Sequence, residues 1–144
     1  MIKNSILNIL LVEDDEADVM NVQQAFKSSQ ITNPLYVATD GSTALAMLRG
    51  AAGQPPIIPP ERRIILLDLN MPQMTGLEFL QQLRADPTIA HIPVVVIAAS
   101  NQERERVGAY DLNVAGYIRK PVAFNVFTDL LVTLNNYWTS CELS

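Results

Sequence analysis

Cysteine and histidine are nearly absent from this sequence of 144 residues, which contains one residue of each. The single cysteine, Cys141, excludes an intramolecular disulfide and fits a reducing compartment. No set of cysteines and histidines with the spacing of a zinc site exists, so we interpret His91 as a solvated loop residue. The sparse use of both residues excludes disulfide-stapled and zinc-dependent folds.

Basic residues and long apolar runs are also scarce. Ten lysines and arginines stand against fifteen acidic residues, a net charge of -5, whereas binding to a nucleic-acid backbone requires a positive face. No apolar run approaches the roughly 18 residues of a membrane span. We therefore expect no direct nucleic-acid partner, no membrane partner and a cytoplasmic location. The length and the 49% of hydrophobic residues suit a single domain over residues 1–144.

Five short apolar runs alternate with segments of helical period. The runs are rich in the β-branched and aliphatic residues that suit a sheet covered on both faces. The predicted strands are residues 6–12, 35–38, 63–68, 94–98 and 116–119. Such alternation predicts an α/β fold, a doubly wound sheet of five parallel strands joined by right-handed crossovers.

The segment 50–63, GAAGQPPIIPPERR, interrupts this rhythm with four prolines and two glycines. Proline removes a backbone donor, so the segment is predicted to be a surface loop and not a helix or a central strand. A tolerated insertion is the favoured interpretation, because a longer loop adds little closure entropy. A contact with a specific partner is the alternative.

Charged residues gather at the carboxyl ends of three predicted strands. Glu13, Asp14 and Asp15 follow the first strand, Asp68 ends the third, and Lys120 follows the fifth. In an open parallel sheet these ends share one rim, where ligands bind. Carboxylates about 4 Å apart repel by roughly 4 kcal/mol at an effective dielectric constant near 20, so the cluster requires a cation or protonation. Oxygen ligands favour Mg²⁺ or Mn²⁺.

Each of these residues also has a simpler interpretation. Asp14 or Asp15 alone is more often the N-cap of the following helix than a ligand. Lys120, which precedes a proline, would by itself be a solvated turn residue. An acid that closes a buried strand, as Asp68 does, is harder to explain without a function.

Three motifs taken in order resemble one known family. LLVEDD, LLDLNMPQMTG and YIRKP, with Lys120 52 positions after Asp68, resemble the receiver domain of two-component response regulators over roughly residues 5–138. More narrowly, the proline-rich loop and the ending LNNYW are similar to single-domain regulators that serve bacterial phytochromes, chiefly in cyanobacteria.

The resemblance implies a flavodoxin-like (βα)5 fold with strand order 2-1-3-4-5 and no output domain. Asp68 would accept a phosphoryl group from a sensor histidine kinase of the phytochrome type. Glu13, Asp14, Asp68 and the backbone carbonyl of Asn70 would hold Mg²⁺, with Mn²⁺ as a substitute, and Lys120 would add a fixed positive charge. Such a domain catalyses its own phosphorylation and dephosphorylation but is not a metabolic enzyme.

Two positions bear on switching. The family places threonine or serine 30 residues after the phosphoacceptor, where this sequence has Ala98. Ser100 is a possible substitute, but SNQE at 100–103 favours a capping box for the fourth helix. Tyr117 stands at the position of the family's switch aromatic, and a half-buried strand residue is an equal alternative.

A homodimer through the last helix and the fifth strand is the expected assembly.

Two alternative functions follow from the same residues. Ala98 would suit a pseudo-receiver that binds partners without being switched by phosphorylation. An aspartate-nucleophile phosphatase of the haloacid dehalogenase type is a weaker alternative, because that family requires a second aspartate where this sequence has Asn70.

Overall fold

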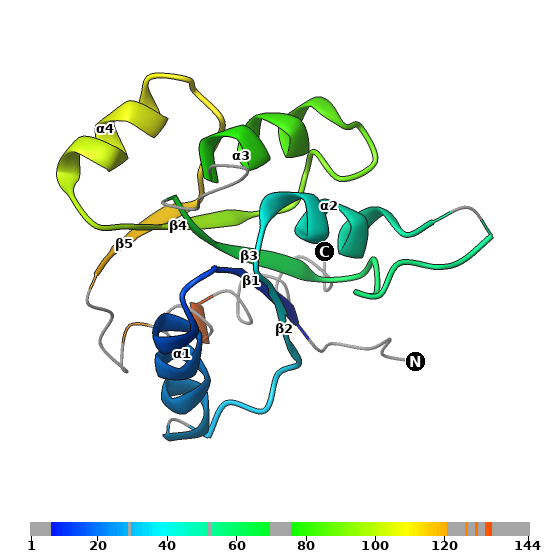
Figure 1. The fold of residues 1–144 in the computed structure, drawn as a ribbon, viewed down its shortest axis with the longest axis horizontal. Helices are drawn as coiled ribbons and strands as arrows, with labels where there is room; N and C mark the ends of the chain where they lie inside the picture. Colours follow the sequence, from blue (N-terminus) through cyan, green and yellow to red (C-terminus); the bar gives the residue numbers. More distant parts are fainter. Residues whose placement is uncertain are drawn as a thin grey trace.

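Five parallel strands form one sheet in the order β2-β1-β3-β4-β5 (Figure 1). The computed structural model describes residues 7–28, 30–51, 53–69 and 76–120, together with residues 126, 129, 132 and 133. The strands are β1 (Asn8–Val12), β2 (Leu35–Ala38), β3 (Arg63–Asp68), β4 (Val94–Ala98) and β5 (Gly116–Arg119). The helices are α1 (Glu16–Ser28), α2 (Gly41–Arg49), α3 (Gly76–Ala85) and α4 (Asn101–Gly108).

The predicted fold class and strand order are confirmed, and four of the five strands have the predicted bounds. The first strand begins at Asn8, and residue 6 lies outside the described residues. The predicted last helix also falls mostly outside them, although residues 126, 129, 132 and 133 are helical. No helix in the described part of the chain is long and apolar enough to cross a bilayer.

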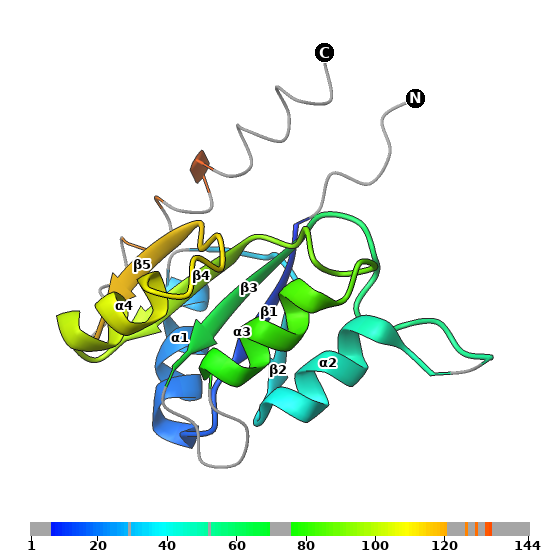
Figure 2. The same ribbon diagram turned by 90° about the horizontal axis from the view of Figure 1, so that it is seen from above.

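Both faces of the sheet are covered, as the apolar strands require. Figure 2 shows α1 on one side of the sheet and α2, α3 and α4 on the other. Leu10, Ile65 and Val96 point into the core beneath α2, α3 and α4, whereas their neighbours in the chain point toward α1. Alternate residues of each central strand therefore enter opposite cores, which explains why these strands carry almost no polar residue before their ends.

Buried Arg63 anchors the proline-rich segment to the start of β3. Its guanidinium donates hydrogen bonds to the backbone carbonyls of Pro59 (2.9 Å), Leu48 (3.1 Å) and Ile58. Ile58 itself is fully buried, whereas its neighbour Ile57 is exposed. The segment up to residue 62 is an irregular connection, as predicted, and it lies at the end of the sheet where β3 begins.

Gly76 lets α3 approach the carboxyl end of β3 closely. A Cβ atom added to Gly76 would lie 2.6 Å from the carbonyl oxygen of Asp68 and 2.6 Å from the Cα atom of Leu69. The N–H of Gly76 also donates to the carbonyl of Leu69 at 3.1 Å. Since the obstacles are backbone atoms, any side chain here would have to push α3 or the end of β3 away.

We predict that Gly76→Ala lowers the free energy of unfolding by about 1–3 kcal/mol, the usual cost of inserting a methyl group into a packed site. Gly108→Ala is the matched control, because a Cβ there meets no atom within 4 Å and alanine favours a helix by up to about 1 kcal/mol. Urea denaturation of both variants provides the measurement. Equal stabilities would contradict the proposed close approach.

Candidate functional site

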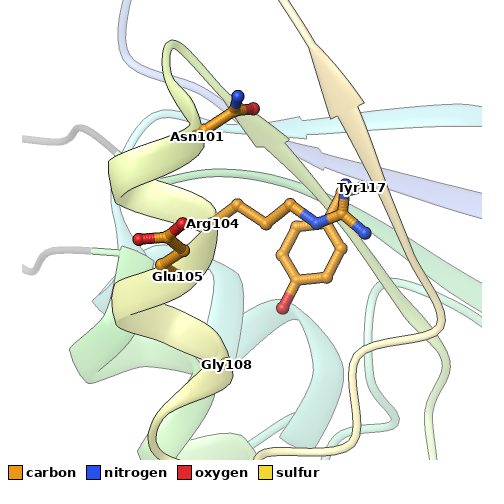
Figure 3. A pocket seen from close by; sticks show the side chains of 5 residues that line it. All are labelled: Asn101, Arg104, Glu105, Gly108 and Tyr117. Carbon is orange, nitrogen blue, oxygen red and sulfur yellow. The ribbon is translucent and has the colours of Figure 1, made fainter.

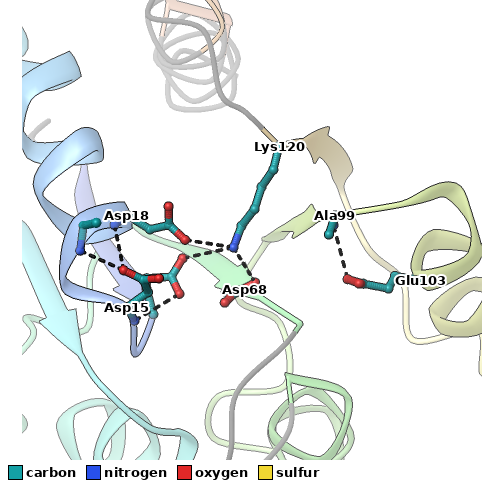
Figure 4. A network of polar contacts seen from close by, with 8 residues as sticks. Asp15, Asp18, Asp68, Ala99, Glu103 and Lys120 are labelled. Carbon is teal, nitrogen blue, oxygen red and sulfur yellow. Dashed lines mark hydrogen bonds and ion pairs between the residues drawn. The ribbon is translucent and has the colours of Figure 1, made fainter.

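The rim at the carboxyl ends of β1, β3 and β5 brings together the charged residues that the sequence predicted. Glu13 and Asp68 are each only 2% exposed, whereas Asp14 is exposed to solvent. The strand order reverses between β1 and β3, which is the place where open α/β sheets bind their ligands. Figure 4 shows the side chain of Lys120 extending from the end of β5 toward Asp68.

Lys120 makes ionic contacts with three carboxylates from three elements. Its Nζ atom lies 3.1 Å from Asp18 Oδ2, 3.2 Å from Asp68 Oδ1 and 3.6 Å from Glu13 Oε1. The interpretation of Lys120 as a solvated turn residue is therefore wrong. Burial acts to lower the pKa of Lys120, but the hydrogen bond to Asp18 and the charges of Asp68 and Glu13 outweigh it and raise the pKa. The ammonium stays charged.

The charged form of Glu13 is disfavoured in this arrangement. Burial and the adjacent carboxylate of Asp68 raise the pKa of Glu13 from 4.5 to about 8, although Lys120 and the backbone N–H of Asp15 act in the opposite direction. One lysine therefore does not compensate the acids fully. A second cation at the rim would remove the remaining repulsion.

The acids are placed so that they could share such a cation. Glu13, Asp14 and Asp68 each offer a carboxylate oxygen, and these atoms lie within 4.8 Å of one another. A set made only of oxygen ligands suits a hard divalent ion such as Mg²⁺ or Mn²⁺. Asn70, the fourth predicted ligand, lies outside the described residues.

Comparison with known proteins agrees with this geometry. The model of the response regulator receiver domain family matches residues 9–132. The chain belongs to this family. Response regulator Rcp1 of Synechocystis sp. is 34% identical over 130 residues, which are 90% of this chain and 87% of Rcp1.

Solved structures of other receiver domains have the same fold. The bacteriophytochrome response regulator RtBRR is 36% identical with a TM-score of 0.73, over 90% of this chain and 78% of RtBRR. The phosphorylated cyanobacterial phytochrome response regulator RcpA is 34% identical with a TM-score of 0.69, over 94% of this chain and 96% of RcpA. The Mn²⁺-bound form of Rcp1 is 33% identical with a TM-score of 0.68, over 92% of this chain and 94% of Rcp1.

Two acids of this receiver domain have roles on α1. Asp15 caps the helix, since its Oδ1 atom accepts hydrogen bonds from the backbone N–H groups of Ala17 (2.8 Å) and Asp18 (3.3 Å). Capping thus applies to Asp15, whereas Asp14 belongs to the acidic cluster. Asp18 is a contact of Lys120 that the sequence did not reveal, because 102 residues separate the two partners.

The start of α4 differs from the predicted capping box in one bond. Ser100 is the N-cap, and its hydroxyl accepts a hydrogen bond from the N–H of Glu103 at 3.3 Å. In a capping box the carboxylate of Glu103 would bind the N–H of Ser100. Instead, Glu103 Oε1 accepts from the N–H of Ala99 at 3.2 Å.

Ala98 and Tyr117 lie on neighbouring strands, β4 and β5. Ala98 is buried, and a cavity of about 60 Å³ is lined by both residues together with Arg104. The guanidinium carbon of Arg104 stands 4.7 Å from the centre of the partly buried Tyr117 ring. In Figure 3 both side chains line a shallow groove beside α4, with Glu105 further along the helix. Tyr117 therefore combines a half-buried ring with a cation–π contact.

The raised pKa of Glu13 predicts that stability depends on pH. The unfolded chain releases this proton near 4.5 and the folded protein near 8, so the folded state binds more protons between these values. The free energy of unfolding of metal-free protein should therefore fall between about pH 5 and pH 8, by on the order of 2 kcal/mol. Glu13→Gln should lack this contribution.

Urea denaturation at several pH values in the presence of a chelator measures this dependence. Glu16→Gln, which removes an exposed acid from the first turn of α1, is the control and should retain the slope of the wild type. If wild type and Glu13→Gln had the same slope, Glu13 would not hold a proton in the folded state.

Proposed function

We propose that this chain is a single-domain response regulator whose Asp68 accepts a phosphoryl group from the phosphohistidine of a sensor histidine kinase. The observation that carries the proposal is the contact of 3.2 Å between Lys120 Nζ and Asp68 Oδ1, beside an acidic cluster that fits a divalent ion. Asp68 is buried, and a surface capping acid would not need such a lysine partner. The domain signals and is not a metabolic enzyme.

The chemistry we assign to Asp68 is nucleophilic attack. A carboxylate oxygen of Asp68 forms a bond to phosphorus while the bond between phosphorus and the histidine nitrogen breaks, and the imidazole leaves. Lys120 remains charged throughout and faces the phosphoryl oxygens with its ammonium group. Asp18 fixes this ammonium from the side of α1 at 3.1 Å.

Glu13, Asp14, Asp68 and the backbone carbonyl of Asn70 are the groups that we propose as ligands of Mg²⁺, with Mn²⁺ as a substitute. The bound ion would neutralise the repulsion between the acids and the incoming phosphoryl oxygens. The oxygen-only ligand set and the unfavourable burial of Glu13 support this assignment.

The relatives suggest which kinase class to test. Rcp1, RcpA and RtBRR resemble this chain over most of their lengths, and the last two are described as phytochrome response regulators. We therefore propose a phytochrome-type histidine kinase as the partner in the cytoplasm. We also propose a homodimer through the fifth strand and the last helix as the assembly that phosphorylation changes.

Intact mass spectrometry after incubation with acetyl phosphate tests the acceptor. We expect a single phosphoryl adduct on the wild type with Mg²⁺, no adduct in the presence of a chelator, and none on Asp68→Asn. Asp15→Asn is the matched control: it removes a neighbouring negative charge, while the asparagine oxygen can still cap α1, so it should be phosphorylated and keep nearly the stability of the wild type.

Other outcomes favour the alternative functions. A folded wild type that binds Mg²⁺ but gains no adduct from acetyl phosphate or from a phosphorylated phytochrome kinase would support the pseudo-receiver, for which Ala98 is the structural argument. Steady turnover of small phosphate esters would support the phosphatase. An unchanged elution volume of the beryllofluoride-treated protein would contradict the dimer proposal.

A further inference from the structure

The N–H group of Ala99 is held by an unusual partner. It lies directly after β4 and donates to Glu103 Oε1 at 3.2 Å (Figure 4). Ala99 is exposed, so water could satisfy this N–H without any help from a side chain. The bond therefore reflects a specific placement of the Glu103 carboxylate at the rim.

The direction of this N–H follows from the geometry of the sheet. The carbonyl of Ala98 accepts a hydrogen bond from the N–H of Lys120 at 3.0 Å, so it points toward β5. In a trans peptide the carbonyl and the next N–H point in opposite directions. The N–H of Ala99 therefore points toward β3, the strand that ends at Asp68.

No backbone acceptor of the described residues continues the ladder at this point. Asp68 pairs with Ile97 in the register of β3 and β4, and among the described residues the N–H of Leu69 makes the last hydrogen bond from β3 to β4, at 3.4 Å to the carbonyl of Ile97. The carbonyl of Leu69 turns to the N–H of Gly76. The N–H of Ala99 thus faces the carboxyl end of β3, where Asp68 lies, and its acceptor is the Glu103 carboxylate.

We propose that Glu103 competes with the phosphoryl group on Asp68 for the N–H of Ala99, so that phosphorylation displaces Glu103 and alters the start of α4. This inference rests on the proposed function. A phosphoryl group is a strong anionic acceptor, and two anions at one N–H repel each other. Because Ala98 has no hydroxyl, the N–H of Ala99 is the donor that β4 has available at its end.

Displacement of the Glu103 carboxylate would act directly on α4. Glu103 lies in the first turn, where its own N–H donates to the N-cap Ser100. Arg104 follows it in the chain and packs over the ring of Tyr117. Release of the Glu103 carboxylate changes the first turn next to this pair, and so transmits phosphorylation to α4 and β5 without a hydroxyl at position 98.

Beryllofluoride, which mimics the phosphoryl group, is the probe for this competition in the presence of Mg²⁺. Glu103→Ala removes the competing acceptor, so its dissociation constant for beryllofluoride should be about 3- to 10-fold lower than that of the wild type. Glu105→Ala is the matched control, since it removes an equal charge from the same helix at a residue that lines the groove. Its dissociation constant should stay within about twofold of wild type.

Amide NMR separates competition from a merely structural role. In the wild type we expect beryllofluoride to shift the amide resonances of Ala99 and of residues 101–108. In Glu103→Ala the resonance of Ala99 should still shift, whereas the shifts along α4 should largely disappear. Glu103→Gln, which keeps an acceptor oxygen without the charge, should bind with intermediate affinity and serves as the second variant if Glu103→Ala does not fold.

Two results would overturn the inference. One is a wild type that binds beryllofluoride while Glu103→Ala binds no more tightly than Glu105→Ala. The other is an Ala99 amide that does not respond in the wild type. A wild type that fails to bind beryllofluoride with Mg²⁺ would instead overturn the proposed function, and the inference with it.

Discussion

The contact between the ammonium of Lys120 and three carboxylates is the interaction on which the rest of the site depends. It joins β5 to β3, β1 and the first turn of α1 in a single ionic cluster. Neighbouring strands lie about 4.8 Å apart, so β5 stands roughly 10 Å from β3 with β4 between them. A long side chain is needed to bridge that distance, and lysine supplies both the length and the charge.

The acids of this cluster repel each other in the folded protein, although the proposed function requires them at the rim. Two of its acids, Glu13 and Asp68, are almost fully buried. Burial and the neighbouring carboxylate raise the pKa of Glu13 to about 8. Removing these two acids would relieve repulsion, yet it would also remove the acceptor and the ligands that we propose. Strain of this kind is expected under the proposed function, because the charges would then be balanced completely only when both a cation and the phosphoryl anion are bound.

The sequence was sufficient for most of the fold and for the centre of the site. The β-branched runs located the strands, and the rule for strand ends placed Glu13, Asp14, Asp68 and Lys120 on one rim. The predicted capping residue Ser100 marked the start of α4.

The sequence could not predict that Asp18 contacts Lys120, nor which backbone N–H group the Glu103 carboxylate binds, and both failures have physical reasons. Asp18 contacts a lysine 102 residues away, and only the tertiary structure decides which face of the first turn of α1 meets β5. For Glu103, the capping motif identified the residue but chose the neighbouring N–H as its partner. The two N–H groups belong to adjacent residues, and the choice between them depends on side-chain torsions that no spacing rule contains.

The anchoring of the proline-rich segment has a practical consequence. Arg63 and Ile58 attach its end to the start of β3, so the segment and the acidic rim lie at opposite ends of the same strand. The exposed part near Ile57 is thus separated from Asp68 by the full length of β3. A fluorophore or an affinity tag inserted there would report on this domain, or immobilise it, without touching the chemistry of Asp68.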